Sequence, residues 1–225
     1  IEWATEKLGE ELTVEDVFDV DVRSLTMNGF RWLRQLASGG MGGAARVRGL
    51  LGTQPLRNYL TEVLHAVDGE LTGVRYNLDR GHLKALAIST SCYSTGRSVT
   101  WVQGSDIHEW QRPRRRALTA VMTIEHVMAS TALPLIFPAV QLENAWYGDG
   151  SIRLTAPLSP ALHLGARRIL AISTRYDPTG PEPEQPTIHG YPPPAQVAGA
   201  LMNSIFLDLL DHDAAQLERL NQLLE

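Results

Sequence analysis

Residues 122–174 read MTIEHVMASTALPLIFPAVQLENAWYGDGSIRLTAPLSPALHLGARRILAIST, and helical and strand-like patterns alternate along this stretch. Thr123 is a typical N-cap residue, because its hydroxyl can accept a hydrogen bond from a backbone N–H of the first helical turn. Glu125 then stands in the first turn, where the helix dipole favours an anion. The sequence therefore predicts a helix through 124–132, which Pro134 ends because proline cannot continue a helix.

The second half of the stretch begins with a Gly-Asp-Gly sequence at 148–150. Glycines tolerate sharp turns and leave room for neighbouring chain segments, so a kink with Asp149 at its centre is predicted. Residues 158–166 then predict a short helix that ends at Gly165. Residues 167–174 form a nearly continuous apolar run, which is typical of a strand buried on both faces of a sheet.

The same alternation continues upstream. Residues 55–66 begin with proline, which suits a first helical turn, and repeat leucine on one face, so they predict an amphipathic helix. Residues 83–90 and 98–102 predict two strands that are separated by a turn around Gly96. Strands that alternate with helices indicate an α/β layered domain.

Two C-terminal segments differ from this pattern. Residues 176–194 are rich in proline and predict an extended, exposed loop. Residues 195–225 repeat apolar side chains every three or four positions, which predicts a long C-terminal helix with a packing role. We interpret residues 1–225 as one α/β domain.

Composition excludes several classes of protein. With 225 residues and 44% hydrophobic composition, the chain can bury one substantial core. A net charge of −5 argues against general nucleic-acid binding, which needs a basic face. Cys92 is the single cysteine and no Cys/His cluster has zinc-ligand spacing, so neither a disulfide nor a metal site is predicted. The apolar stretch 131–140 is too short to span a bilayer, and no signal-peptide pattern is present, which favours a cytoplasmic or peripheral membrane location.

A series of short motifs follows in a fixed order. Residues 129–138 have the pattern Ala-Ser-x-Ala-x-Pro-x-x-Phe-Pro, and the Asp-Gly step at 149–150, Pro157 and the Gly-Ala pair at 165–166 come after it. This order resembles the C-terminal part of the catalytic domain of patatin-like phospholipases.

Two upstream segments extend the resemblance. GLLGTQPLRNYL at 49–60 is similar to the family's glycine-leucine turn that leads into a Pro-Leu-Arg helix. KALAISTSCYSTGRSVTW at 84–101 is similar to the family's central hairpin, so the resemblance covers residues 49–174. It implies a three-layer α/β sandwich, with a mixed sheet and helices on both faces.

The resemblance also implies a serine hydrolase with a serine-aspartate dyad, in which Asp149 is the general base. A serine hydroxyl is a poor nucleophile until a positioned base removes its proton, and a carboxylate can do this. On the motif alone, Asp149 would merely stabilise a turn, and we interpret the other Asp-Gly pair, Asp68-Gly69, as such a turn.

No nucleophile is identified in the chain. The family places its serine in a Gly-x-Ser-x-Gly elbow after a glycine-rich oxyanion loop. The segment 96–100 lacks the final glycine and enters a strand, and Ser38–Gly43 is interpreted as a flexible loop. The family order places both elements before residue 1, so we expect the serine and the first sheet strands to be missing from this chain.

Further residues have two interpretations each. Leu135 and Phe137 precede the candidate base in a rigid apolar loop, where they line an acyl-chain pocket or belong to the core. The arginine-rich run at 110–116 suits anionic lipid headgroups, but a solvated loop is favoured. His126 and His163 are expected to be structural or exposed, with a Ser-His-Asp triad as the less favoured alternative.

The predicted function is hydrolysis of lipid acyl esters, with a lipid or acyl-ester substrate and no metal or organic cofactor. Contact with a membrane surface is compatible with this function, and the oligomeric state stays open. Two alternatives remain: a non-catalytic lipid- or protein-binding module with the same fold, and an anion-binding regulatory domain built around the arginines.

Overall fold

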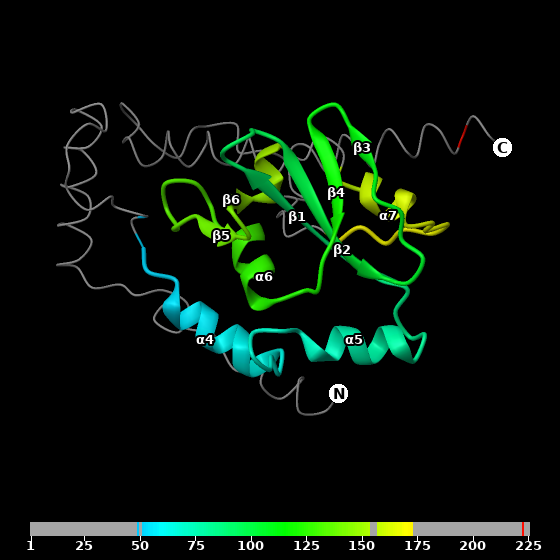
Figure 1. Ribbon diagram of the computed structural model, residues 1–225, viewed down its shortest axis with the longest axis horizontal. Helices are drawn as coiled ribbons and strands as arrows, with labels where there is room; N and C mark the ends of the chain where they lie inside the picture. The colour runs from blue at the N-terminus through cyan, green and yellow to red at the C-terminus, as the bar shows by residue number, and fades with distance from the viewer. Residues whose placement is uncertain (1–48, 50, 154–156, 173–221, 223–225) are drawn as a thin grey trace, which may run out of the picture. The chain divides into compact units, whose positions relative to one another are not determined.

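The structure is a computed structural model that describes residues 49, 51–153, 157–172 and 222 (Figure 1). Contacts divide the chain into two compact units, Ile1–Gly150 and Ser151–Glu225, and each is described by itself. The single domain over 1–225 stays a prediction. The proline-rich segment 176–194 and, apart from the helical Gln222, the predicted helix 195–225 lie outside the described residues.

Six strands of the first unit form one mixed sheet in the order β3-β4-β2-β1-β6-β5 (Figure 1). The strands are β1 (Ala85–Cys92), β2 (Ser98–Gly104), β3 (Gln111–Arg112), β4 (Arg115–Thr119), β5 (Val140–Leu142) and β6 (Ala145–Asp149). Neighbouring strands are antiparallel, except that β2 and β4 are parallel.

The helices of the first unit are α4 (Gln54–Val63), α5 (Thr72–Asp79) and α6 (Ile124–Ser130). A mixed sheet with helices confirms the predicted α/β class. The expected absence of the first strands stays a prediction.

The predicted hairpin in the middle of the chain is confirmed. Strands β1 and β2 pair from Ala85↔Gly104 to Ser91↔Ser98, and Gly96 in the connecting turn has φ +61°. This left-handed conformation costs glycine little, because glycine has no Cβ. Val99 and Val102 of β2 are fully buried, so β2 anchors the sheet to the core.

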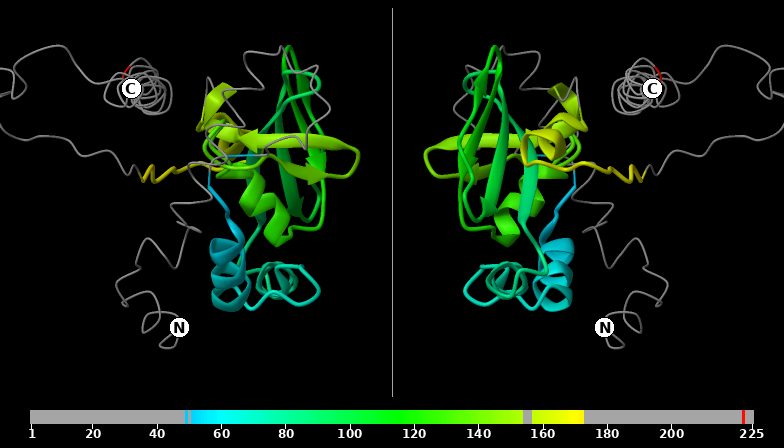
Figure 2. Two further views of the ribbon diagram at one scale, coloured as in Figure 1. Left: turned by 90° about the vertical axis from the view of Figure 1, so that its left-hand side faces the viewer. Right: turned by 90° about the vertical axis from the view of Figure 1, so that its right-hand side faces the viewer.

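Helix α6 covers one face of the sheet and packs against β1, β5 and β6 (Figure 2). The buried core below it contains Trp101, Met128 and Tyr147. The Trp101 ring meets the Tyr147 ring edge-on, with 5.4 Å between centroids, and the His126 ring in the same way at 5.0 Å. Such aromatic contacts add to the stabilisation from burial.

The residues at the start of α6 are the predicted ones, and they make contacts that the sequence did not predict. Thr123 is the N-cap, and its backbone N–H donates to Nδ1 of His126 at 3.2 Å. Glu125 lies in the first turn as expected, and its carboxylate also forms an ion pair with Arg57 of α4. The helix ends at Ser130, two residues earlier than predicted.

The predicted helix over 55–66 is α4, and the segment before it is fixed to the loop after α6. The Leu51 N–H donates to the Ile136 carbonyl at 2.9 Å. A Cβ on Gly49 would lie 2.6 Å from the Pro138 nitrogen, so this close approach requires glycine. The predicted turn at Asp68-Gly69 is also confirmed, with φ values of +51° and +81°.

The loop prediction for residues 110–116 is wrong. These residues form the β3–β4 hairpin, because β4 finds a partner in β2 along Ser98↔Arg115 to Val102↔Thr119. An arginine-rich run has no intrinsic strand signal, so the distant partner strand decides its structure.

In the second unit, the predicted short helix is α7 (Ser159–His163), and Gly165 follows it with φ +84°. The strand predicted over 167–174 is wrong for its described part, because residues 167–172 form no strand. Leu170 and Ile172 are 86% and 83% exposed. An apolar run becomes a strand only with a neighbour to pair with, and no strand pairs with residues 167–172 in the described ranges.

We predict that His126 makes stability depend on pH. Burial lowers the pKa of His126, so the folded chain resists the proton that an unfolded histidine takes up below about pH 6.5. Stability that is present above this pH is therefore lost as the pH falls. His126→Gln keeps an acceptor at the third helical position but does not titrate. Urea denaturation should show a smaller loss between about pH 7 and about pH 5 in the variant, whereas parallel losses would contradict the prediction.

Candidate functional site

Asp149 is the last residue of β6 and lies half-buried at an interior position of the sheet. It pairs with Thr90 of β1, and its backbone N–H donates to the Ala132 carbonyl at 3.0 Å. Residues that face each other in an antiparallel pair project from the same face. Asp149 therefore shares the face of Thr90, which is also the face covered by α6.

The glycines on both sides of Asp149 are required by close contacts. A Cβ on Gly148 would lie 2.2 Å from the Tyr93 hydroxyl oxygen. A Cβ on Gly150 would lie 2.2 Å from the Ser89 carbonyl oxygen. Both distances are far below a normal contact. At Gly150 the obstacle is backbone, so only glycine lets β6 approach β1 there, whereas at Gly148 it is the outer end of a side chain.

Tyr93 is the polar aromatic side chain beside the candidate base. Its ring covers Gly148, its backbone N–H donates to the Trp146 carbonyl at 2.9 Å, and it is 47% exposed. Burial raises the pKa of Tyr93, and the negative charge of Asp149 raises it further. The phenol therefore stays protonated and is available as a hydrogen-bond donor.

Hydrogen bonds between buried side chains fix the strand opposite Asp149. The Trp101 Nε1–H donates to Thr90 Oγ1 at 2.9 Å, and the Thr90 hydroxyl donates to the Val99 carbonyl at 3.3 Å. Buried polar groups that are paired in this way hold a unique geometry. Thr90 thus has a structural role beside Asp149.

Cys92 lies at the end of the same strand and is buried. Burial alone would raise the pKa of Cys92, but hydrogen bonds with Thr95 and Ser94 and the charge of Arg116 lower it overall. The positive charge of Arg116 on β4 therefore acts on a thiol at the end of β1.

The two predicted acyl-pocket residues have different positions. Phe137 lines a small apolar hollow between α4, α6 and β5, together with Leu56, Met128 and Ala132. Leu135 does not line the hollow and is 59% exposed, with a left-handed φ of +72°. The hollow is next to the candidate base, because Ala132 also accepts the Asp149 N–H.

Other predicted candidates lie elsewhere. Ser98 begins β2 and is 2% exposed, so it is a strand residue and not an exposed elbow. His126 belongs to the core and His163 is exposed on α7, in agreement with their expected structural or surface positions. The loop Ser38–Gly43 lies outside the described residues.

The described residues contain neither a metal-binding cluster nor a membrane-spanning helix. No three His, Cys, Asp or Glu side chains are grouped there to hold a metal ion. None of the helices in this part of the chain is long and apolar enough to cross a bilayer.

Sequence reasoning identified Asp149 but missed Tyr93. The signal for Tyr93 is its register, because it follows β1 directly and its backbone bonds to β6 beside the candidate base. That register depends on pairing between residues far apart in the chain, which composition and periodicity do not reveal.

We predict that the two glycines differ in their tolerance of a methyl group. Gly150→Ala forces a Cβ against the Ser89 backbone, and overpacking of this kind should lower the free energy of unfolding by about 2 kcal/mol. Gly148→Ala meets the outer end of the Tyr93 side chain, which can move, so its loss should be smaller. Tyr93→Ala should restore most of the loss from Gly148→Ala and none of that from Gly150→Ala. If urea denaturation gave the same loss for Gly148→Ala and Gly150→Ala, and Tyr93→Ala restored both equally, the two contacts would not be as described.

Comparison with known proteins identifies the family. The family model described as patatin-like phospholipase matches residues 3–162, which is more than two thirds of the chain. No curated protein and no solved structure matches significantly. Domains of this family are in general lipid acyl hydrolases, and lipids are their substrates. The chain belongs to the patatin-like phospholipase family.

Proposed function

We propose that this domain hydrolyses acyl esters of lipids through a serine-aspartate dyad, with Asp149 as the general base. One observation carries the proposal. Asp149 ends β6 between two glycines that bring its backbone against β1, and it does so within the Asp-Gly step that resembles the family's catalytic aspartate.

The reaction would have two halves. In the first, the Asp149 carboxylate accepts the serine proton while the serine oxygen attacks the ester carbonyl, and the alcohol leaves with a proton. In the second, Asp149 accepts a proton from water, and the resulting attack releases the fatty acid and frees the serine. The described residues contain no Gly-x-Ser-x-Gly sequence, so we propose a serine outside them.

Tyr93 fits the role of a positioning residue. Its hydroxyl lies over Gly148, one residue from the base, and it keeps its proton because its pKa is raised. By contacting Gly148, Tyr93 holds the end of β6 against β1 and so fixes the backbone from which the Asp149 side chain projects. We propose this role in addition to the dyad.

Phe137 fits the near end of an acyl-binding site. The hollow that it lines is apolar and shares Ala132 with the Asp149 contact. We propose that its apolar lining meets the start of an acyl chain. Leu135 lies outside this hollow, and we propose that it meets a more distant part of the acyl chain at the surface.

We predict that Asp149→Asn lowers ester turnover by about 10²–10⁴-fold, because an amide cannot accept the serine proton. The measurement is hydrolysis of a soluble chromogenic ester by the full protein. Asp68→Asn is the matched control, since it changes the other Asp-Gly pair, in a surface turn, and asparagine tolerates its φ of +51°. The control should retain normal turnover.

A serine-directed phosphonate separates the alternatives. The active protein should be labelled, and Asp149→Asn should slow the labelling without unfolding the chain. Normal turnover in Asp149→Asn would remove this residue from the mechanism. Absence of turnover and labelling in the wild-type protein would favour a non-catalytic module.

We predict that Phe137→Ala changes acyl-length preference. The loss of apolar contact should lower kcat/KM for a medium-chain ester by about tenfold relative to a short-chain ester. Phe137→Leu keeps more of the side-chain volume, so its ratio of kcat/KM values should lie between those of the wild type and Phe137→Ala. This milder variant also controls for loss of folding. Leu135→Ala provides the comparison at an exposed position. An unchanged ratio in both Phe137 variants would assign that ring to core packing alone.

A further inference from the structure

The turns of two hairpins lie side by side at one end of the sheet. The β1–β2 turn covers residues 93–97, and the β3–β4 turn consists of Pro113 and Arg114. The Ser98 N–H, directly after the first turn, donates to the Arg114 carbonyl in the second at 2.9 Å. The two turns therefore form one continuous surface.

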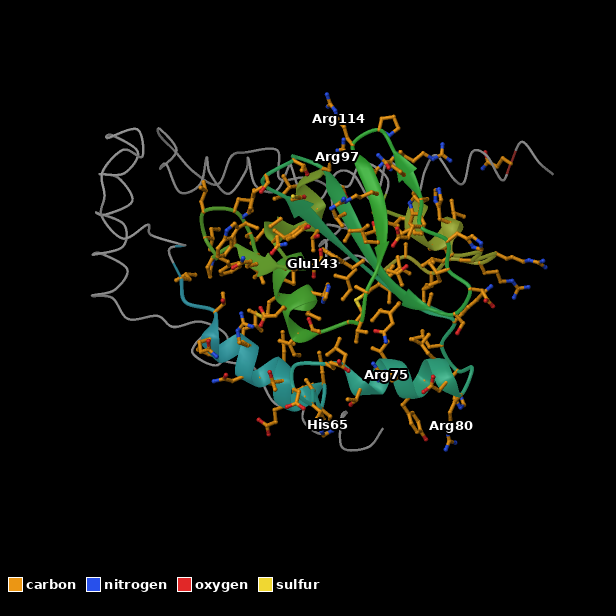
Figure 3. All side chains as sticks on the ribbon, viewed as in Figure 1. His65, Arg75, Arg80, Arg97, Arg114 and Glu143 are labelled. Atoms are coloured by element: carbon orange, nitrogen blue, oxygen red, sulfur yellow. The ribbon has the colours of Figure 1, made fainter. Side chains whose placement is uncertain are left out.

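This surface carries three exposed arginines, Arg97, Arg112 and Arg114, which we name the arginine edge. Figure 3 shows Arg97 and Arg114 at the same end of the sheet. The salt bridges between described residues are Arg57–Glu125 and Arg75–Glu70, so within these ranges the arginine edge has no carboxylate partner. Its positive charge is available to an external anion.

Arg116 adds a further positive charge closer to the core. It follows Arg115 on β4, is half-buried, and its buried Nε–H has no hydrogen-bond partner in the described structure. The rest of its guanidinium interacts with the Tyr147 hydroxyl and lies near Cys92. A cation without a described carboxylate partner thus lies between the arginine edge and the strand that ends at Asp149.

Arg114 has an unusual backbone conformation at the tip of the β3–β4 hairpin. Arg114 has φ +62°, a left-handed conformation that glycine or asparagine usually occupies at such a turn. Strain of this kind is concentrated at functional sites. A charged side chain on a strained backbone at the tip of a hairpin is suited to contact with a partner.

Aromatic side chains connect the arginine edge to the candidate site. Tyr93 begins the turn that contains Arg97, and it covers Gly148 beside Asp149. Trp146, whose carbonyl accepts the Tyr93 N–H, is 41% exposed. Tyrosine and tryptophan are enriched where proteins meet lipid headgroups, because their rings are apolar and their tips are polar.

We propose that the arginine edge binds the surface of an anionic phospholipid bilayer and so presents Asp149 to ester substrates at that surface. The proposal deepens the proposed function, on which it rests for the substrate. The exposed aromatics beside the local cationic surface favour a lipid surface, whereas a chain with a net charge of −5 has no general affinity for nucleic acid.

The test measures sedimentation of the full protein with phosphatidylcholine vesicles that contain no phosphatidylserine or about 30% of it. Wild-type protein should bind the anionic vesicles more tightly, and added salt should weaken the binding. The double variant Arg97→Gln with Arg114→Gln should bind them about 30-fold more weakly.

The matched control is Arg75→Gln with Arg80→Gln on α5, which removes the same charge. Figure 3 shows both arginines at the other end of the unit, away from Arg97 and Arg114. Arg75 pairs with Glu70 at 3.4 Å, and Arg80 lies 4.9 Å from the centre of the Tyr76 ring. This variant should bind vesicles nearly as the wild type does.

Arg114→Gly separates binding from folding. It relieves the left-handed strain and removes the charge, so its Tm should not fall while its vesicle binding weakens. Equal binding by the arginine-edge variants and the wild type, or an equal loss in the α5 control, would overturn the proposal. Arginine-dependent binding to a DNA oligonucleotide without vesicle binding would also overturn it.

Hydrolysis of the soluble ester distinguishes the two proposals. The arginine-edge variants should retain it, because they act on docking and not on the base. If Asp149→Asn leaves hydrolysis unchanged while the arginine edge still governs vesicle binding, the proposed mechanism fails and the docking surface stands.

Discussion

The close approach of β6 to β1 is the constraint on which the candidate site depends. Gly148 and Gly150 have no room for a Cβ, since Tyr93 and the Ser89 carbonyl occupy that space. Asp149, between them, takes its position from this contact and from the bond of its N–H to Ala132. The turn and the proposed chemical role of Asp149 are therefore parts of one arrangement, because the kink determines where the carboxylate lies.

The β1–β2 hairpin connects the candidate chemistry to the candidate docking surface. Its strand β1 pairs with the end of β6, and its turn contains both Tyr93 and Arg97. The turn therefore links the surroundings of Asp149, through Tyr93, to the cationic surface, through Arg97. For an enzyme that takes its substrate from a bilayer, such proximity shortens the path from the surface to the base.

Local signals predicted most of the described fold. Proline at the start of α4, Thr123 before α6 and Gly165 after α7 act within a few residues, so their elements lie where the sequence placed them. The errors concern strands at 110–116 and 167–174, where pairing with a distant segment decides the outcome. The two residues predicted for an acyl pocket divide for a similar reason, because the hollow is lined by three separate elements and by a loop that contributes Phe137 and not Leu135.

The sequence by itself determined the family pattern, the candidate base Asp149 and the helices that bear strong end signals. Only the tertiary structure decided that Tyr93 covers Gly148 beside this base, that Gly150 is sterically required and that two arginine-bearing turns share one surface. The physical reason is the range of the interactions. Capping and turn preferences act between neighbours in the chain, whereas strand register and side-chain contacts join residues dozens of positions apart.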